Sequence, residues 1–397
     1  MIERKRYIDR LRPFFHKDVV KVLTGLRRSG KSVLLAQVQE ALRTDGADPA
    51  AMLSYNFEDL RNLPLCHAEA LYHDILARLD GRTDGVCLFF DEIQEVDGWE
   101  RVVNSLRVSH HADIYVTGSN AHLLSGELAT LLAGRYVAFP VYPFSFAEYC
   151  AAYPGKSTDA CWRSYLALGG MPFLTHLDDE AAAHQYLQDI YRSVVLKDIV
   201  ERHTVRDVDL LARVVRYAAE SIGRTFSATS IAKYFKSEHR SVAPETIMGY
   251  LAACTESFLL YRIPRQDLAG KKLLTINEKY YLADHGLRTA IHGGTQDIDQ
   301  TLENIVCMEL LRRGYRVTVG KAGTQEIDFV CDRAKERIYV QVAYLLAAPE
   351  TVEREFGAYK TIRDNYPKYV VTMDPVDLSR DGILHKNVLD FLRMETY

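Results

Sequence analysis

The chain has 397 residues, of which 48% are hydrophobic and 26% are charged, and its formal net charge is −4. This length predicts two or more domains, and the composition is typical of folded globular proteins and excludes a disordered one. No apolar run reaches the ~18 residues of a membrane-spanning helix, and the small net charge excludes a chain that is basic throughout.

The N-terminus and the cysteines indicate the compartment. Residues 1–15 are rich in charge and lack the apolar segment of a secretory signal. The seven cysteines are scattered, and no two of them form a Cys-x-x-Cys pair. This spacing indicates neither a zinc knuckle nor a disulfide framework. We therefore expect a cytoplasmic protein that does not contact a membrane.

Short apolar runs alternate with helical stretches between residues 19 and 143. The runs lie at residues 20–24, 51–56, 86–90 and 113–117, and turn or loop residues follow each of them. Such alternation predicts an α/β fold in which helices wrap a parallel sheet. Residues 1–150 are therefore predicted to form one α/β domain built on this parallel sheet.

A phosphate-binding motif follows the first apolar run. Residues 25–32 read GLRRSGKS, which matches G-x-x-x-x-G-K-[ST] between a strand pattern and a helix pattern. Such a loop lets backbone amides approach phosphate oxygens at a helix N-terminus. Lys31 would contact the β- and γ-phosphates of ATP, and the Ser32 hydroxyl would ligate Mg²⁺. The residues predicted to bind the nucleotide are Gly25, Leu26, Arg27, Arg28, Ser29, Gly30, Lys31, Ser32 and Val33.

Two carboxylates end the apolar run at residues 86–90. Asp91 at the tip of this strand would hold the Mg²⁺ shell, and Glu92 would act as the base that polarises the attacking water. The alternative is that the Asp-Glu pair caps a turn, but the phosphate-binding motif upstream favours the catalytic interpretation. The two motifs together predict an active ATPase.

Two further positions are candidates for the catalytic step. Ser119 and Asn120 follow the run at residues 113–117, and AAA+ strand order would place one of them beside the γ-phosphate; the alternative is a turn. Arg135 follows a glycine where the chain returns to the sheet, which suits an arginine finger acting in its own or a neighbouring subunit. The alternative for Arg135 is a solvated surface residue.

These segments resemble a known family. They read GLRRSGKS, LFFDEIQEVDGWE, VTGSNAHLLSGELATLLAGRY and YPFSFAEY, followed by GGMPF at residues 169–173. They resemble the prokaryotic AAA-family ATPases that carry a C-terminal DUF4143 domain, and the resemblance covers nearly the whole chain. It implies a P-loop domain of the AAA+ type at residues 1–150. By this resemblance the Walker A, Walker B, sensor-1 and GR positions fall on Lys31 and Ser32, Asp91 and Glu92, Ser119 and Asn120, and Arg135.

The middle of the chain is predicted to hold a helical connector at residues 151–207 and a winged-helix domain at residues 208–292. Helices at 227–235 and 244–258, separated by a polar turn, predict a helix-turn-helix. Strand runs at 261–265 and 273–283 predict a wing. The basic residues that could contact DNA phosphates are Lys236, His239, Arg240, Arg262, Arg265, Lys271 and Lys272. The alternative is a winged helix used only for packing, since acidic residues interleave with the basic ones.

Residues 293–397 show the order of elements of an α/β domain of the PD-(D/E)xK nuclease type. Glu303 lies in a predicted helix, Asp328 in one strand run and Gln341 in the next. The chemistry of that fold needs a second acidic ligand and a lysine two residues later, whereas these positions hold Gln341 and Ala343. An amide is a poorer Mg²⁺ ligand than a carboxylate, so we expect a nuclease-like fold that has lost its activity.

The function predicted from these features is an ATPase whose cycle acts on DNA through the winged-helix and nuclease-like domains. Two alternatives stay open. One is an ATP-gated, Mg²⁺-dependent DNA endonuclease that uses Glu303 and Asp328, which metal-dependent plasmid nicking would reveal. The other is a nucleotide-dependent switch that acts on protein partners, with slow turnover that DNA does not stimulate. A homo-oligomer is compatible with Arg135 acting on a neighbouring subunit.

Overall fold

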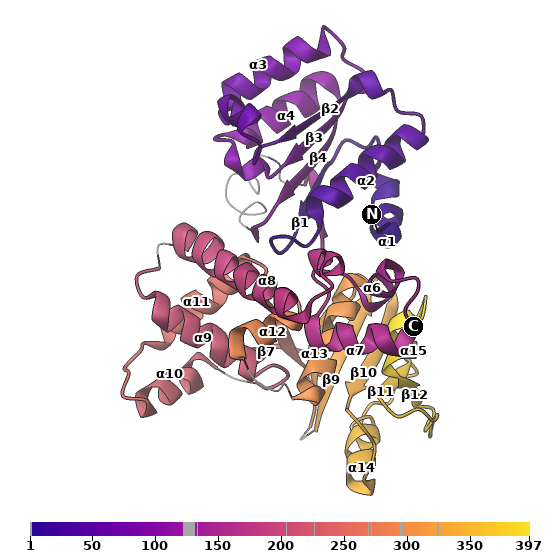
Figure 1. The fold of residues 1–397 in the computed structure, drawn as a ribbon. Helices are drawn as coiled ribbons and strands as arrows, with labels where there is room; N and C mark the ends of the chain where they lie inside the picture. Colours follow the sequence, from indigo (N-terminus) through magenta and orange to yellow (C-terminus); the bar gives the residue numbers. More distant parts are fainter. Residues whose placement is uncertain are drawn as a thin grey trace. The chain divides into compact units, whose positions relative to one another are not determined.

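The computed structural model describes residues 2–121, 132, 134–203, 205–225, 227–268, 270, 272–293, 297–323 and 325–397, without the side chains of residues 196, 197, 272 and 274–277. The chain forms two compact units (Figure 1). Residues 1–142 with 256–258 make the first, and residues 143–255 with 259–397 make the second. Within the described residues, no helix is both long and apolar enough to cross a bilayer.

The first unit is a five-stranded parallel sheet with strand order β2-β3-β4-β1-β5. Helices α3 and α4 lie on one face of this sheet, and α1 and α2 lie on the other (Figure 1). Its elements are α1 (Lys5–Leu11), β1 (Val20–Thr24), α2 (Lys31–Thr44), β2 (Met52–Asn56), α3 (Ala68–Leu79), β3 (Cys87–Asp91), α4 (Trp99–His110), β4 (Asp113–Gly118) and β5 (Tyr136–Pro140).

The parallel sheet predicted from the alternating runs is confirmed. Strands β1, β3 and β4 are buried along their whole length, as expected for parallel strands that helices cover on both faces. Val22, Phe90 and Val116 of these strands belong to one hydrophobic core with residues of α3 and α4. In this strand order β4 lies between β1 and β3. Because the three strands are parallel, the loops that follow them all lie at the carboxyl end of the sheet.

The second unit contains a mixed seven-stranded sheet with strand order β12-β11-β10-β9-β8-β6-β7. Its strands are β6 (Leu260–Asp267), β7 (Lys272–Leu282), β8 (Arg316–Ala322), β9 (Gln325–Arg333), β10 (Glu336–Val342), β11 (Lys368–Thr372) and β12 (Leu384–Asn387). Its helices are α6 (Phe146–Ala152), α7 (Thr158–Leu168), α8 (Glu180–Ser193), a π-helix (Val194–Glu201), α9 (Val208–Glu220), α10 (Ala228–Ser237), α11 (Pro244–Glu256), α12 (Gly286–His292), α13 (Ile298–Arg312), α14 (Pro349–Gly357) and α15 (Val388–Arg393).

The predicted division of this region at residues 207 and 292 differs from the structure. Strands β6 and β7 form the antiparallel hairpin predicted as a wing, but β6 also pairs in parallel with β8, where Arg265 is opposite Val319. One sheet therefore crosses the boundary predicted at residue 292, and one compact unit contains all three predicted regions. The alternating pattern of a wing is also that of an edge hairpin, and only pairing with a distant strand distinguishes them.

The Gly-Gly pair at residues 169–170 marks the end of a helix. Helix α7 ends at Leu168, and the amide of Gly170 donates to Oδ2 of Asp284 at 2.7 Å. Next to it, Nε2 of His285 lies 2.6 Å from the carbonyl oxygen of Tyr165. The end of α7 is therefore held by hydrogen bonds to the residues that precede α12. This interaction gives the GGMPF segment a role within the second unit.

Candidate functional site

The loop between β1 and α2 carries the predicted phosphate-binding residues. Gly25 packs so closely that a Cβ atom there would lie 2.1 Å from the carbonyl oxygen of Val141, so only glycine fits at the first position of the motif. Gly30 is the N-cap of α2, and the helix begins at Lys31. The free amides of the first turn of α2 thus face the loop, which is the arrangement that binds phosphate at a helix N-terminus.

Lys31 is buried against this loop. Its Nζ donates to the carbonyl oxygens of Gly25 and Leu26 at 3.1 and 3.2 Å. The same Nζ lies 3.7 Å from Oε1 of Glu92. The next residue, Ser32, is exposed. The loop thus holds a fixed ammonium group and an accessible hydroxyl at the start of one helix.

The remaining loop residues differ in their environment. Leu26 and Ser29 are fully buried, and Val33 is exposed. Arg27 donates from Nη2 to Oε1 of Glu58 at 3.0 Å. Arg28 has a φ of 62°, a left-handed conformation that closes the turn of the loop. That these residues bind the nucleotide follows from their position in the loop and stays a prediction.

Asp91 ends β3 beside this loop. Its Oδ1 accepts a hydrogen bond from Oγ1 of Thr117 at 2.6 Å, and the Ser32 hydroxyl also hydrogen-bonds to this carboxyl group. Burial raises the pKa of Asp91, and the hydrogen bonds from Thr117 and Ser32 oppose that shift. Carboxylate and hydroxyl oxygens are ligands that Mg²⁺ prefers. The oxygens of Asp91 and Ser32 therefore fit a Mg²⁺ ion.

Glu92 follows in a left-handed backbone conformation with a φ of 53°. Its amide donates to Oγ1 of Thr117 at 2.9 Å, and its carboxylate accepts from Gln94. Burial acts to raise the pKa of Glu92, but the charges of Lys31 and Arg27 and the hydrogen bond from Gln94 lower it more. Glu92 is therefore ionised at neutral pH, which is the form that a general base requires.

Ser119 and Asn120 follow β4, between β1 and β3, and both are buried. The Ser119 hydroxyl is the last of the groups that act to lower the pKa of the Glu92 carboxylate. The structure therefore brings these two residues to the edge that carries Lys31 and Glu92. A role for Asn120 in orienting water stays a prediction.

Comparison with known proteins concerns the domain that contains these residues. Residues 17–150 match the protein family described as an AAA domain. The chain is 39% identical to an uncharacterized protein of Haemophilus influenzae, over 99% of this chain and 98% of that protein. The chain belongs to the same family as this Haemophilus protein, and its N-terminal region matches an AAA domain.

Three more matches extend the comparison. An uncharacterized protein of Methanocaldococcus jannaschii is 27% identical, over 87% of this chain and 79% of that protein. The solved structure of a Walker-type ATPase of Pyrococcus abyssi shares the fold with a TM-score of 0.50 at 12% identity, over 73% of this chain and 96% of that one. Residues 160–298 match a domain of unknown function, DUF8612. The comparisons therefore show DUF8612 where the resemblance implied DUF4143.

Arg135 lies at the amino end of the strands of the AAA sheet, and the nucleotide site lies at their carboxyl end. It precedes β5, and its carbonyl oxygen accepts from the amide of Val20 at the start of β1. Five residues of strand separate that position from the loop at Gly25, a distance of ~17 Å at the rise of a parallel strand. This separation does not favour an arginine finger that acts within one AAA domain, and that role of Arg135 stays a prediction. Action on the nucleotide of a neighbouring subunit stays a prediction.

Arg4 and Thr117 were not found from the sequence. Arg4 is 1% exposed, and its guanidinium donates to the carbonyl oxygens of Ser29 at 3.1 Å and Tyr142 at 2.8 Å. Arg4 therefore fixes the phosphate-binding loop of the AAA domain to the segment after β5. No sequence motif marks either residue, since Arg4 lies among other charged residues near the N-terminus and Thr117 resembles an ordinary strand residue.

Replacing Arg4 with alanine is expected to lower the free energy of unfolding of the AAA domain by ~2 kcal/mol, because two buried carbonyl groups lose a charged donor. ATP binding should weaken as well, since the carbonyl of Ser29 lies in the loop. Chemical denaturation and an ATP titration measure the two effects. Arg43→Ala is the control, because Arg43 is exposed and its guanidinium contacts the exposed Glu40. Equal stability of Arg4→Ala and the control would contradict the role of Arg4.

The helix-turn-helix predicted in the second unit forms two helices, α10 and α11, and Ser227 caps α10 by accepting from the amide of Ser230. Three of the arginines predicted to contact DNA form ion pairs with acidic residues of the protein instead. Arg240 pairs with Asp209 at 2.7 Å and Arg262 lies 3.8 Å from Glu278, while Arg265 pairs with Glu326 at 3.1 Å. Lys236 and His239 are exposed in and beside the turn. Lys271 and the side chain of Lys272 lie outside the described part of the chain.

The predicted remnants of a nuclease site do come together. Glu303 of α13 and Asp328 of β9 both lie next to Lys279 of β7. Gln341 of β10 accepts from the amide of Asp328 at 3.1 Å. Ala343, at the position of the lost lysine, is 4% exposed. Sequence patterns did not indicate Lys279 as a member of this cluster.

Proposed function

We propose that the protein binds ATP with Mg²⁺ at the edge of the AAA sheet and hydrolyses it there. The observation that carries this proposal is the convergence of the Lys31 ammonium and the ionised Glu92 carboxylate, 3.7 Å apart, next to Asp91 and Ser32. Phosphate binding needs the ammonium group, metal binding needs the oxygen ligands, and water activation needs the base. These groups come from two segments, the start of α2 after β1 and the end of β3, at the carboxyl end of one sheet.

In the proposed reaction, the loop amides and Lys31 hold the β- and γ-phosphates. Glu92 accepts a proton from a water molecule while the water oxygen forms a bond to the γ-phosphorus and the bond from that phosphorus to the ADP oxygen breaks. Asn120 would orient the same water. Ser32 and Asp91 would hold Mg²⁺, which supplies positive charge next to the phosphates.

We further propose that this cycle is coupled to DNA through the second unit. The support comes from α10 and α11 and the turn between them, because Lys236 in the last turn of α10 and His239 in the turn are both exposed. Exposed basic side chains in such positions are suited to phosphate contacts. The pairing of Arg240 with Asp209 and of Arg265 with Glu326 limits this surface to few residues. We therefore expect modest affinity for DNA and a shallow dependence on salt, because few phosphates would be neutralised.

The test is steady-state ATP hydrolysis with and without single-stranded, duplex and junction DNA. One DNA form should stimulate turnover, and Lys236→Ala with His239→Ala should reduce the stimulation without changing the rate in the absence of DNA. Lys335→Ala is the control, because Lys335 is equally exposed in the turn between β9 and β10. Turnover that no DNA form changes would contradict the coupling to DNA and favour a switch that acts on protein partners.

A further inference from the structure

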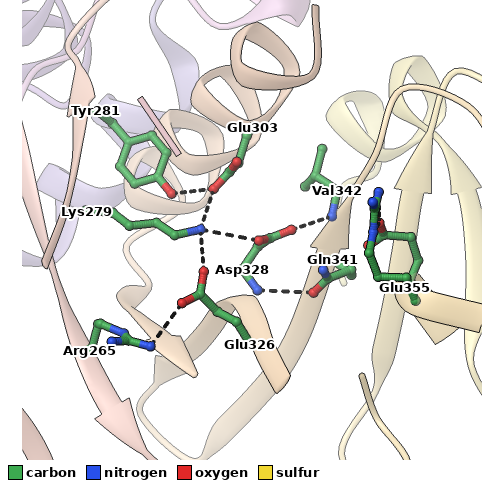
Figure 2. A network of polar contacts seen from close by, with 10 residues as sticks. Arg265, Lys279, Tyr281, Glu303, Glu326, Asp328, Gln341, Val342 and Glu355 are labelled. Atoms are coloured by element: carbon green, nitrogen blue, oxygen red, sulfur yellow. Dashed lines mark hydrogen bonds and ion pairs between the residues drawn. The ribbon is translucent and has the colours of Figure 1, made fainter. Parts of the chain in front are cut away.

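A cluster of charged side chains lies in the second unit, on β7, α13 and β9 (Figure 2). At its centre is Lys279, whose side chain is 2% exposed. Its Nζ lies 3.0 Å from Oε1 of Glu303, 3.0 Å from Oε1 of Glu326 and 3.4 Å from Oδ1 of Asp328. One ammonium group therefore contacts three carboxylates from two elements. Two of these carboxylates, Glu303 and Asp328, are those that a nuclease of the predicted type would use to bind metal.

Each carboxylate has a further partner in addition to Lys279 (Figure 2). The hydroxyl of Tyr281 donates to Glu303 at 2.7 Å. Arg265 donates to Glu326 at 3.1 Å, and the amide of Val342 donates to Oδ2 of Asp328 at 3.0 Å. The protein's own donors thus solvate these negative charges.

The other groups in this cluster do not complete a binding site for a divalent cation. Gln341 supplies an amide where the fold needs an acid, and its Oε1 already accepts from the amide of Asp328. The second oxygen of Glu303 faces Gly223, where an added Cβ atom would lie 2.2 Å from it. Backbone therefore covers that side of Glu303, and an ion would have to bind on the side where Lys279 contacts Oε1. With Lys279 in place, the Mg²⁺ that the nuclease fold implies does not match this set of residues.

The ammonium group of Lys279 also excludes a second cation. Its Nζ lies 3.0 Å from Oε1 of Glu303 and 3.0 Å from Oε1 of Glu326, so the ammonium group already occupies the space between these carboxylates. A Mg²⁺ ion binds its oxygen ligands at ~2.1 Å. An ion so close to these carboxylates would lie against a buried ammonium group of like charge and be repelled by it.

We propose that the Lys279 ammonium takes the place of the metal ion in this cluster. The second unit holds its acidic residues together with an internal cation, binds no divalent cation there and does not cleave DNA. This inference is independent of ATP hydrolysis, since all of its residues lie in the second unit. It makes the nuclease-like region a binding or scaffolding element.

Titration of the full chain with Mn²⁺ in the absence of nucleotide, followed by electron paramagnetic resonance, tests the proposal. Wild type and Asp328→Asn should bind the same number of Mn²⁺ ions. Lys279→Met should gain one more, and Asp328→Asn in the Lys279→Met background should remove it. Lys321→Met is the matched control, because Lys321 is exposed on β8, and it should gain none.

Two results would overturn the proposal. One is a Mn²⁺ ion on the wild-type protein that Asp328→Asn removes, or plasmid nicking with Mn²⁺ that Asp328→Asn abolishes. The other is a folded Lys279→Met variant that gains no ion. Circular dichroism establishes the folding of each variant. If Lys279→Met does not fold, the comparison between wild type and Asp328→Asn decides the question alone.

Discussion

Replacing Glu92 with glutamine is expected to lower the rate of ATP hydrolysis by ~100- to 10,000-fold, the usual contribution of a general base. The amide cannot accept the proton of the attacking water, although it keeps the shape of the side chain. ATP binding should persist, because the loop and Lys31 are unchanged. The measurements are the turnover number and the dissociation constant of ATP for the same preparation.

Glu95→Gln is the control for this variant. Glu95 lies three residues further along the chain, at the end of a short 3-10 helix, and is exposed. It should hydrolyse ATP at the rate of the wild-type protein. Wild-type turnover in Glu92→Gln would show that another group activates the water, and equal losses in both variants would indicate a general defect of this segment.

Replacing Lys21 with methionine is expected to lower the free energy of unfolding of the AAA domain by ~3–5 kcal/mol, as happens when one partner of a buried ion pair is removed. Lys21 of β1 is fully buried and forms an ion pair with Asp113 of β4. The amide of His16 at 2.8 Å and the hydroxyl of Tyr115 at 3.0 Å also donate to Asp113. These neutral donors would remain, but the charge of Asp113 would be uncompensated.

Urea denaturation of the first unit measures this effect. Lys17→Met is the matched control, because Lys17 lies on the same segment and is exposed, and its loss should change stability by less than ~1 kcal/mol. A Lys21→Met variant as stable as this control would contradict the importance of the pair. The prediction is separate from catalysis, since Lys21 lies within β1, before the strand reaches the nucleotide loop.

The nucleotide site could be predicted from the sequence because its signals are local. The motif from Gly25 to Ser32 is continuous, and Asp91 and Glu92 end a single apolar run. Their convergence then follows from the strand order of a parallel sheet. The supports of the site could not be predicted, because Arg4 reaches the loop from 25 residues away and Thr117 reaches Asp91 from 26 residues away.

In the second unit, the contacts that decide the arrangement are not local in sequence, so less of it could be predicted. Its strands could be predicted one by one, but the pairing of β6 with β8 is not local and alters the predicted division into domains. The loss of the acid and the lysine at positions 341 and 343 is visible in the sequence. The replacement cation is not, because Lys279 lies 49 residues before Asp328, on a strand predicted to belong to a wing.

The most direct test of the central claim is phosphate release from ATP by the wild-type protein and by Lys31→Ala. Lys31 is the one side chain whose proposed contacts are with the nucleotide phosphates and with the base Glu92. The account predicts Mg²⁺-dependent turnover by the wild-type protein and loss of both turnover and ATP binding in Lys31→Ala. Turnover that survives in folded Lys31→Ala would contradict hydrolysis at this site.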